Sequence, residues 1–137
     1  GKDVYMDIRM IHFQSHDDDR GCLVVAETMK EIPFDIKRLY YIYDVGKDKE
    51  RGFHSHKRLE QVYIGIHGSM KVTLFDGKER KEVILDNPKQ GLYIGHDVWR
   101  TITDFSPDAV LLVAASEHYS EDDYIRNCDE FVASLNK

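Results

Sequence analysis

The sequence predicts one all-β domain spanning residues 1–137, an antiparallel sandwich or barrel with a single C-terminal α-helix. Short runs rich in β-branched and aromatic residues recur along the chain, and turn-forming residues separate them. The apolar residues change to a helical spacing only after Ser120. The sequence contains no internal repeat, linker or low-complexity segment, so we expect the whole chain to form one domain.

Three strands are expected in the first third of the chain. Apolar residues alternate over residues 6–13, while residues 23–26 and 38–45 are dense in strand-forming residues. Residues 17–21 predict a turn, because acidic side chains bond to nearby backbone groups and a glycine closes the segment. Pro33 excludes a regular central strand around it.

The strands expected further along are short and separated by turns. They cover residues 61–66, 71–75, 80–85, 91–95, 99–102 and 109–115. Asp76-Gly77 is a strong signal for a two-residue hairpin loop. Because residues 109–115 are continuously apolar, we expect that strand to be buried on both faces.

The C-terminal segment has the pattern of an amphipathic helix. Residues 120–123 resemble a capping box with an acidic first turn, which suits a helix N-terminus. Apolar residues then recur at helical spacing, at Tyr124, Cys128, Phe131, Val132 and Leu135. We therefore predict one helix that begins at Ser120.

Composition narrows the class of function. The chain of 137 residues and 16.0 kDa has a formal charge of -6 and a pI near 5.6, which argues against a nucleic-acid partner. It shows no signal peptide and no apolar run long enough to cross a bilayer, so no membrane partner is expected. Cys22 and Cys128 lie far apart in the sequence and are expected to be free thiols. These features predict a soluble cytoplasmic protein.

Two histidines one residue apart, His54 and His56, lie in the segment RGFHSHK of residues 51–57. Side chains alternate along a strand, so both imidazoles should point to the same face. Arg51 adds a fixed cation beside them. Such a pair can serve as metal ligands or as acid and base.

The residues at the other metal-ligand positions of the motif argue against a metal site. The spacing resembles the first cupin motif, G-x5-H-x-H-x3-4-E-x6-G, with Gln61 at the carboxylate position. The second cupin motif has a histidine where this chain has Arg100. A guanidinium has no lone pair and carries a permanent positive charge, so it cannot bind a divalent metal. We expect a cupin-type jelly-roll barrel with no metal and no other cofactor.

Acid–base chemistry is the use that remains. An imidazole with an ordinary pKa of about 6.5 can take and return a proton at cellular pH. Arg51, Gln61 and Arg100 are expected to lie near it, and cations stabilise a developing oxyanion. The combination suits removal of a proton beside a carbonyl, which gives an enediolate that is reprotonated on the neighbouring carbon.

Several segments together resemble the nucleotide-sugar 3,4-ketoisomerases. They are residues 51–57, 59–61, 91–94, 98–100 and 120–126. The resemblance covers nearly the whole chain and implies a metal-free cupin-type jelly roll. It also implies a dTDP-4-keto-6-deoxy-D-glucose 3,4-ketoisomerase, which moves the carbonyl from C4 to C3 in the making of dTDP-3-amino-3,6-dideoxyhexoses. Its expected assembly is a homodimer that exchanges N-terminal strands.

The same resemblance implies residue roles. It makes His54 the catalytic base and His56 a proton donor or relay. Arg51 is expected to contact the pyrophosphate or the keto sugar, and Tyr40 the sugar. Arg20 and Arg100 occupy positions that vary in the family with the C4 configuration of the product, and this pair of arginines leaves the gluco or galacto outcome open. Ser55, where an alanine is more usual, is expected on the outer face of the strand.

Three other functions fit parts of the pattern. A sugar 3,5-epimerase would also use a histidine base beside a carbonyl in a metal-free jelly roll. A non-catalytic sugar-binding cupin would bind ligand without exchanging its protons with solvent. A metal-dependent cupin oxygenase would carry stoichiometric iron or zinc.

Overall fold

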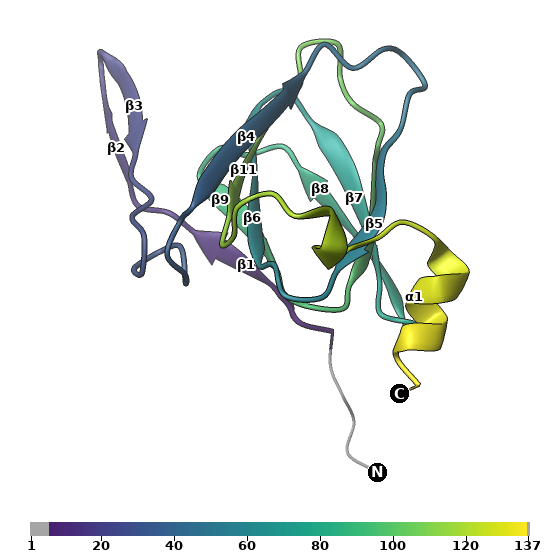
Figure 1. The fold of residues 1–137 in the computed structure, drawn as a ribbon. Helices are drawn as coiled ribbons and strands as arrows, with labels where there is room; N and C mark the ends of the chain where they lie inside the picture. Colours follow the sequence, from purple (N-terminus) through teal and green to yellow (C-terminus); the bar gives the residue numbers. More distant parts are fainter. Residues whose placement is uncertain (1–5, 137) are drawn as a thin grey trace.

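A computed structural model of the chain describes residues 6–136 as two five-stranded antiparallel sheets, a separate hairpin and one short C-terminal helix (Figure 1). The first sheet has the strand order β1-β9-β6-β11-β4. Its strands are β1 (Ile8–His12), β9 (Gln90–Ile94), β6 (Gln61–His67), β11 (Val110–Ala115) and β4 (Arg38–Tyr43). Neighbours in space are distant in sequence, which is the connectivity of a jelly roll.

The second sheet has the order β12-β5-β10-β7-β8. Its strands are β12 (Tyr124–Ile125), β5 (Arg51–His56), β10 (Trp99–Thr103), β7 (Met70–Phe75) and β8 (Arg80–Leu85). The predicted fold, an all-β antiparallel jelly-roll barrel with one C-terminal helix, is confirmed. None of the helices among residues 6–136 is long and apolar enough to cross a membrane.

The core fills the space between the two sheets. Val72 and Leu74 of β7 are buried against Leu111 and Val113 of β11, because alternate residues of each strand point inward. On the other face of β11, Val110 and Leu112 are only half buried. The expectation that this strand is buried on both faces is therefore met only towards its end, where Ala114 and Ala115 are both buried. Before that point, half-buried and buried residues alternate.

The hairpin between β7 and β8 is present, but its loop has four residues, 76–79, and not two. The Oδ1 atom of Asp76 accepts the backbone N–H groups of Lys78 at 2.8 Å and Glu79 at 2.7 Å. Gly77 adopts a φ of 98°, which its missing side chain permits. The side-chain bonds of Asp76 thus stabilise a wider turn than the Asp-Gly pair predicted.

A second hairpin extends away from the barrel (Figure 1). It consists of β2 (Ser15–Asp18) and β3 (Gly21–Val24), and these strands pair only with each other among the described residues. The predicted turn is found, shortened to Asp19 and Arg20. The strand expected at residues 23–26 lies two residues earlier.

The predicted start of the C-terminal helix is wrong. Helix α1 covers only Cys128–Ser134, and the side chain of Asn127 caps it by accepting the N–H of Glu130 at 3.0 Å. Ser120 makes no side-chain cap bond; it precedes a 3₁₀ turn at Glu121–Asp123. The next two residues form β12, because they pair with β5. This pairing brings the segment that precedes α1 onto the histidine strand.

Candidate active site

Strand β5 carries both histidines and lies between β10 and β12. His54 is paired with Arg100, but the next pair joins Gly52 to Thr101, so Phe53 is an extra residue that forms a bulge. Gly52 and Phe53 both have positive φ, 92° and 60°. A Cβ on Gly52 would lie 2.9 Å from the carbonyl oxygen of Arg100, so only glycine fits there. Beyond the bulge the strand is regular.

His54 and His56 lie on the same face of β5, as predicted. Their ring centroids are 4.8 Å apart, and the ring planes meet at 76°. His54 lines a cavity of about 300 Å³, whereas His56 is 0% exposed and does not line it. The two imidazoles therefore occupy different depths.

Strands of both sheets form the wall of this cavity. Its lining consists of Arg38, Tyr40 and Ile42 from β4, Arg51, Gly52 and His54 from β5, with Tyr63, Ile102, Tyr124 and Arg126. The lining contains three arginines and no acidic residue. Although the whole chain is acidic, this cavity is cationic and suits an anionic ligand.

Two polar atoms of the lining have no protein partner among residues 6–136, Nε of Arg38 and Nε2 of His54. Buried polar atoms are normally satisfied, so both are available to a bound ligand. Arg126 is held differently: Glu121 accepts its Nε at 2.6 Å and its Nη2 at 2.9 Å, and its guanidinium lies 4.2 Å from the centre of the Tyr124 ring. Arg126 thereby fixes Tyr124 at the edge of the cavity.

A chain of hydrogen bonds runs from Arg100 to the cavity. Arg100 is 0% exposed; its Nη1 donates to Oε1 of Gln61 at 2.6 Å, and its Nε and Nη2 donate to the carbonyl of Val98. Nε2 of Gln61 donates to the hydroxyl of Tyr40 at 3.0 Å. Since this hydroxyl already accepts a bond from Gln61, its own proton is free to be donated into the cavity. Arg100 thus acts on the cavity through Gln61 and Tyr40.

Burial keeps both histidines neutral. Desolvation, and next the charge of Arg100, lower the pKa of His54 to about 3 and lower that of His56 as well. Desolvation also raises the pKa of Tyr40, so its hydroxyl keeps its proton. A neutral imidazole and a protonated phenol are the forms needed for a base and a hydrogen-bond donor.

His56 is bound from behind by a carboxylate. Its Nδ1 lies 3.1 Å from Oδ2 of Asp123, which comes from the 3₁₀ turn before β12. Tyr124 packs on the same imidazole, with the ring centroids 4.4 Å apart.

The structure brings together most residues predicted from the sequence. His54, Arg51 and Tyr40 line the cavity, and His56, Gln61 and Arg100 lie directly behind it. Arg20 is not with them. Its side chain is 86% exposed at the tip of the β2–β3 hairpin and pairs with Asp18 at 2.6 Å.

Ser55 alternates with His54 and His56 along β5, so its side chain lies on the face opposite the histidines, as expected, but this face is not open to solvent because Ser55 is 0% exposed. Ile125 of β12 is its neighbour in the ladder, and helix α1 contacts both β5 and β12.

Four residues of the site escaped prediction. Arg38 precedes the aromatic run of β4, and its inward alternation with Tyr40 was the available signal. Asp123, Tyr124 and Arg126 were assigned to the expected helix, where an acidic first turn explained the aspartate and core packing the tyrosine. Their positions depend on pairing with β5, which no local pattern reveals.

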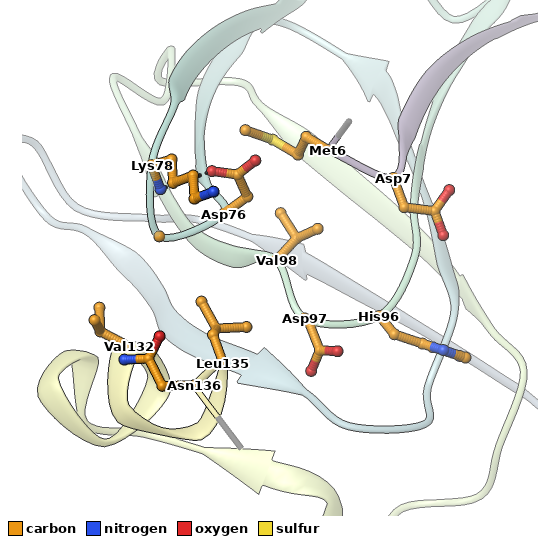
Figure 2. Close-up of a pocket in the computed structure, with 11 residues that line it drawn as sticks. Met6, Asp7, Asp76, Lys78, His96, Asp97, Val98, Val132, Leu135 and Asn136 are labelled. Carbon is orange, nitrogen blue, oxygen red and sulfur yellow. Dashed lines mark hydrogen bonds between the residues drawn. The ribbon is translucent and has the colours of Figure 1, made fainter. Parts of the chain in front are cut away.

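A larger cavity of about 420 Å³ lies at the other end of the barrel, beside the β7–β8 loop and α1 (Figure 2). Its polar lining includes Asp7, His96 and Asp97. Asp76 is used by the turn that it caps, through its bond to the backbone of Lys78. Among the described residues, the lining of the larger cavity includes neither a pair of histidines nor an arginine. The smaller cavity is therefore the one with the chemistry for catalysis.

The residues around the histidine pair do not fit a metal ion. Arg100 and Gln61 bond to each other where the cupin motifs have metal ligands. Within residues 6–136, no three His, Cys, Asp or Glu side chains gather in a way that could hold a metal. A buried guanidinium beside two imidazoles would repel a divalent cation.

Comparison with known proteins assigns the chain to a protein family. The family described as FdtA: WxcM-like, C-terminal, matches residues 6–136. The chain belongs to this family. A relative, the TDP-4-oxo-6-deoxy-alpha-D-glucose-3,4-oxoisomerase of Aneurinibacillus thermoaerophilus, is 48% identical over 134 residues, which cover 96% of each chain.

Solved structures agree with the FdtA/WxcM-like assignment. A 3,4-ketoisomerase from Helicobacter canadensis is 48% identical, with a TM-score of 0.95 over 97% of this chain and 100% of its own. A histidine-to-asparagine mutant of the 3,4-ketoisomerase QdtA from Thermoanaerobacterium thermosaccharolyticum, in complex with TDP-4-keto-6-deoxyglucose, is 46% identical, with a TM-score of 0.93 over 96% and 95%. The chain is an isomerase of the 3,4-ketoisomerase type, and the family and activity predicted from the sequence are confirmed.

Proposed function

We propose that this isomerase acts on TDP-4-keto-6-deoxyglucose and moves the carbonyl from C4 to C3. The observation that carries this proposal is a neutral His54 in a cavity lined by three arginines and no carboxylate. A pyrophosphate-linked keto sugar supplies both the anion and the acidic C–H that such a cavity can use. The names of two relatives support this substrate: the oxoisomerase of A. thermoaerophilus, and the QdtA mutant crystallised with the same sugar nucleotide.

His54 is the base in this mechanism. Its Nε2 takes the proton from C3, and the C–H electron pair forms a C3=C4 double bond while the C4 oxygen becomes an oxyanion. Tyr40 donates its free hydroxyl proton in a hydrogen bond to that oxygen, and Arg51 adds positive charge. The negative charges of the bound pyrophosphate oppose the effect of Arg100 and strengthen His54 as a base.

Protonation of the enediolate at C4 completes the transfer: the imidazolium of His54 gives up its proton, which reaches C4 directly or through a bound water, and His54 is neutral again. The hydroxyl on C3 gives up its proton and becomes the new carbonyl, while the C4 oxygen gains one. His56 does not line the cavity, so it acts behind His54 and not as a direct donor to C4. The 3-keto group formed is the carbonyl that an aminotransferase needs to make a 3-amino sugar.

We further propose that the enzyme works as a homodimer with exchanged N-terminal strands. Leu39, Tyr41 and Tyr43 are exposed along the outer face of β4, which is an edge strand. The β2–β3 hairpin exposes Leu23 and pairs with no other strand among residues 6–136. An isolated two-stranded hairpin is marginally stable, so a second subunit is the natural cover for both surfaces. In such a dimer, Arg20 would reach the partner's cavity.

Proton NMR of the purified enzyme with TDP-4-keto-6-deoxyglucose in deuterated water tests the reaction. The proposal predicts loss of the C3 proton and appearance of a 3-keto sugar. In product formed in ordinary water, the coupling of the C4 proton reports the configuration. Exchange at C5 without a 3-keto product would instead show epimerase chemistry. Tight binding with an unchanged spectrum would show a binding protein, and either result overturns the proposal.

A further inference from the structure

Asp123 and His56 form a buried pair behind the cavity, and the steps above give the carboxylate no role. His56 is 0% exposed and Asp123 is 6% exposed. Oδ2 of Asp123 lies 3.1 Å from Nδ1 of the imidazole. Oδ1 also accepts the backbone N–H of Arg58 at 2.7 Å, and Oδ2 that of Leu59 at 3.3 Å. These two backbone donors fit an ionised carboxylate.

This environment determines where His56 carries its proton. An ionised carboxylate only accepts hydrogen bonds, so the ring nitrogen that faces it must donate. Burial and the charge of Arg100 lower the pKa of His56, so the ring is neutral and has a single N–H. That hydrogen is therefore on Nδ1, and Nε2 keeps its lone pair.

The free nitrogen belongs to a ring that contacts the base. The His54 and His56 rings meet edge to face, with centroids 4.8 Å apart. The Nε2 atoms of both rings are buried and have no protein partner among residues 6–136. Tyr124 packs against both rings and restricts their rotation. The orientation and tautomer of His56 therefore affect how easily His54 can become an imidazolium.

We propose that Asp123 is a positioning residue for the isomerase, which fixes His56 as the Nδ1–H tautomer and presents a lone pair beside His54. When His54 takes the C3 proton it becomes a cation next to Arg100. A neutral His56 with a free Nε2 stabilises that cation, whereas an Nε2–H in the same place would oppose it. The inference rests on the proposed role of His54 as the base.

Asp123→Asn is the sharpest test, because the amide is isosteric with the carboxylate. Its oxygen can still accept the N–H of Arg58, while its NH₂ group donates to Nδ1 of His56 and forces the ring proton to Nε2. The longer bond from the N–H of Leu59 at 3.3 Å is lost. We expect kcat to fall about 10³–10⁴-fold with a nearly unchanged KM, the upper value being the loss when a triad aspartate is replaced by asparagine. The matched control is Asp122→Asn, since Asp122 is the exposed neighbour.

¹⁵N NMR of histidine-labelled protein supplies a signal that a purely structural role would not move. In the wild-type enzyme, Nδ1 of His56 should show the shift of a protonated ring nitrogen and Nε2 that of a bare one, and Asp123→Asn should reverse them. Thermal unfolding shows whether the variant folds, and the wild-type spectrum tests the tautomer even if it does not. An Nε2–H tautomer in the wild type, or a reversed tautomer with kcat within threefold, would overturn the proposal. The spectrum needs no substrate, so its outcome is separate from that of the proposed function.

Discussion

His54 lies directly across the β5–β10 ladder from Arg100, and the bulge at Phe53 begins at the very next residue. The bulge requires positive φ at Gly52 and Phe53. Glycine adopts this conformation readily, but at Phe53 it costs free energy and persists only where the surroundings enforce it. His54 lines the cavity, while Arg100 on the neighbouring strand is buried in the barrel and bonds to Gln61. The base His54 therefore lines the cavity next to the bulge, with the buried cation Arg100 as its partner in the ladder.

Gly52→Ala tests the bulge. A Cβ would lie 2.9 Å from the Arg100 carbonyl and 3.1 Å from the Thr101 Cα, so β10 must move. We expect a loss of about 3–4 kcal/mol in unfolding free energy and a large fall in kcat. Gly21→Ala is the control, because Gly21 also has positive φ but has no atom within 4 Å of the added Cβ, so only the backbone strain of about 1–2 kcal/mol applies. Equal losses of stability in urea denaturation would contradict the account of the bulge.

Tyr40→Phe removes the hydroxyl that the Arg100–Gln61 chain orients. Loss of one donor to a developing oxyanion typically lowers kcat about 10²-fold, and we expect that effect. We also expect a loss of about 1–3 kcal/mol in unfolding free energy, because Nε2 of the buried Gln61 loses its acceptor. Tyr41→Phe, on the exposed face of the same strand, should leave kcat unchanged. If the two variants had the same kcat in a steady-state assay, Tyr40 would not be a donor to the oxyanion.

The fold could be predicted from sequence because its signals are local. Alternating apolar residues and turn residues mark strands such as β7 and β8 within a few positions. The site was predictable where a single strand carries it, as with His54 and His56. Asp123 and Tyr124 could not be placed, because β12 is only two residues long and forms through its pairing with β5. An acidic run before an apolar periodic segment is also the pattern of a helix N-terminus. The local pattern therefore predicted a helix where the structure has a 3₁₀ turn and β12.

Stability should depend on pH through the buried histidines. The pKa of His54 is lowered to about 3 and that of His56 is also lowered, whereas an unfolded histidine titrates near about 6.5. Between these values the unfolded chain binds more protons, so the free energy of unfolding is highest above pH 6.5 and falls as the pH falls below it.

Urea denaturation at pH 7.5, 6 and 5 measures this dependence. Carboxylates with lowered pKa values, such as those of Asp17 and Glu121, contribute at still lower pH. His54→Asn should make the dependence on pH between 5 and 6.5 shallower. A wild-type free energy of unfolding that is the same at pH 5 and 7.5 would show that the histidines are not buried in the neutral form.

Arg20 tests the exchanged dimer. If its guanidinium contacts substrate in the partner's cavity, Arg20→Ala should raise KM about 10–100-fold, as expected for loss of a charged hydrogen bond. Mixing Arg20→Ala chains with His54→Asn chains should then restore activity, because each heterodimer contains one intact cavity. Random pairing of the two chains leaves roughly a quarter of all cavities intact. No recovery after co-refolding, in a mixture shown to contain heterodimers, would place Arg20 outside the site.

The central claim is that the proton is removed by His54 in the smaller, cationic cavity and not in the larger one that contains His96. The most direct measurement is the rate at which TDP-4-keto-6-deoxyglucose loses its C3 proton in deuterated water, compared for His54→Asn and His96→Asn. We predict a loss of at least about 10³-fold for His54→Asn, in a protein with wild-type circular dichroism, and an unchanged rate for His96→Asn. Retained removal of the C3 proton in His54→Asn, or its loss in a folded His96→Asn, would contradict the account.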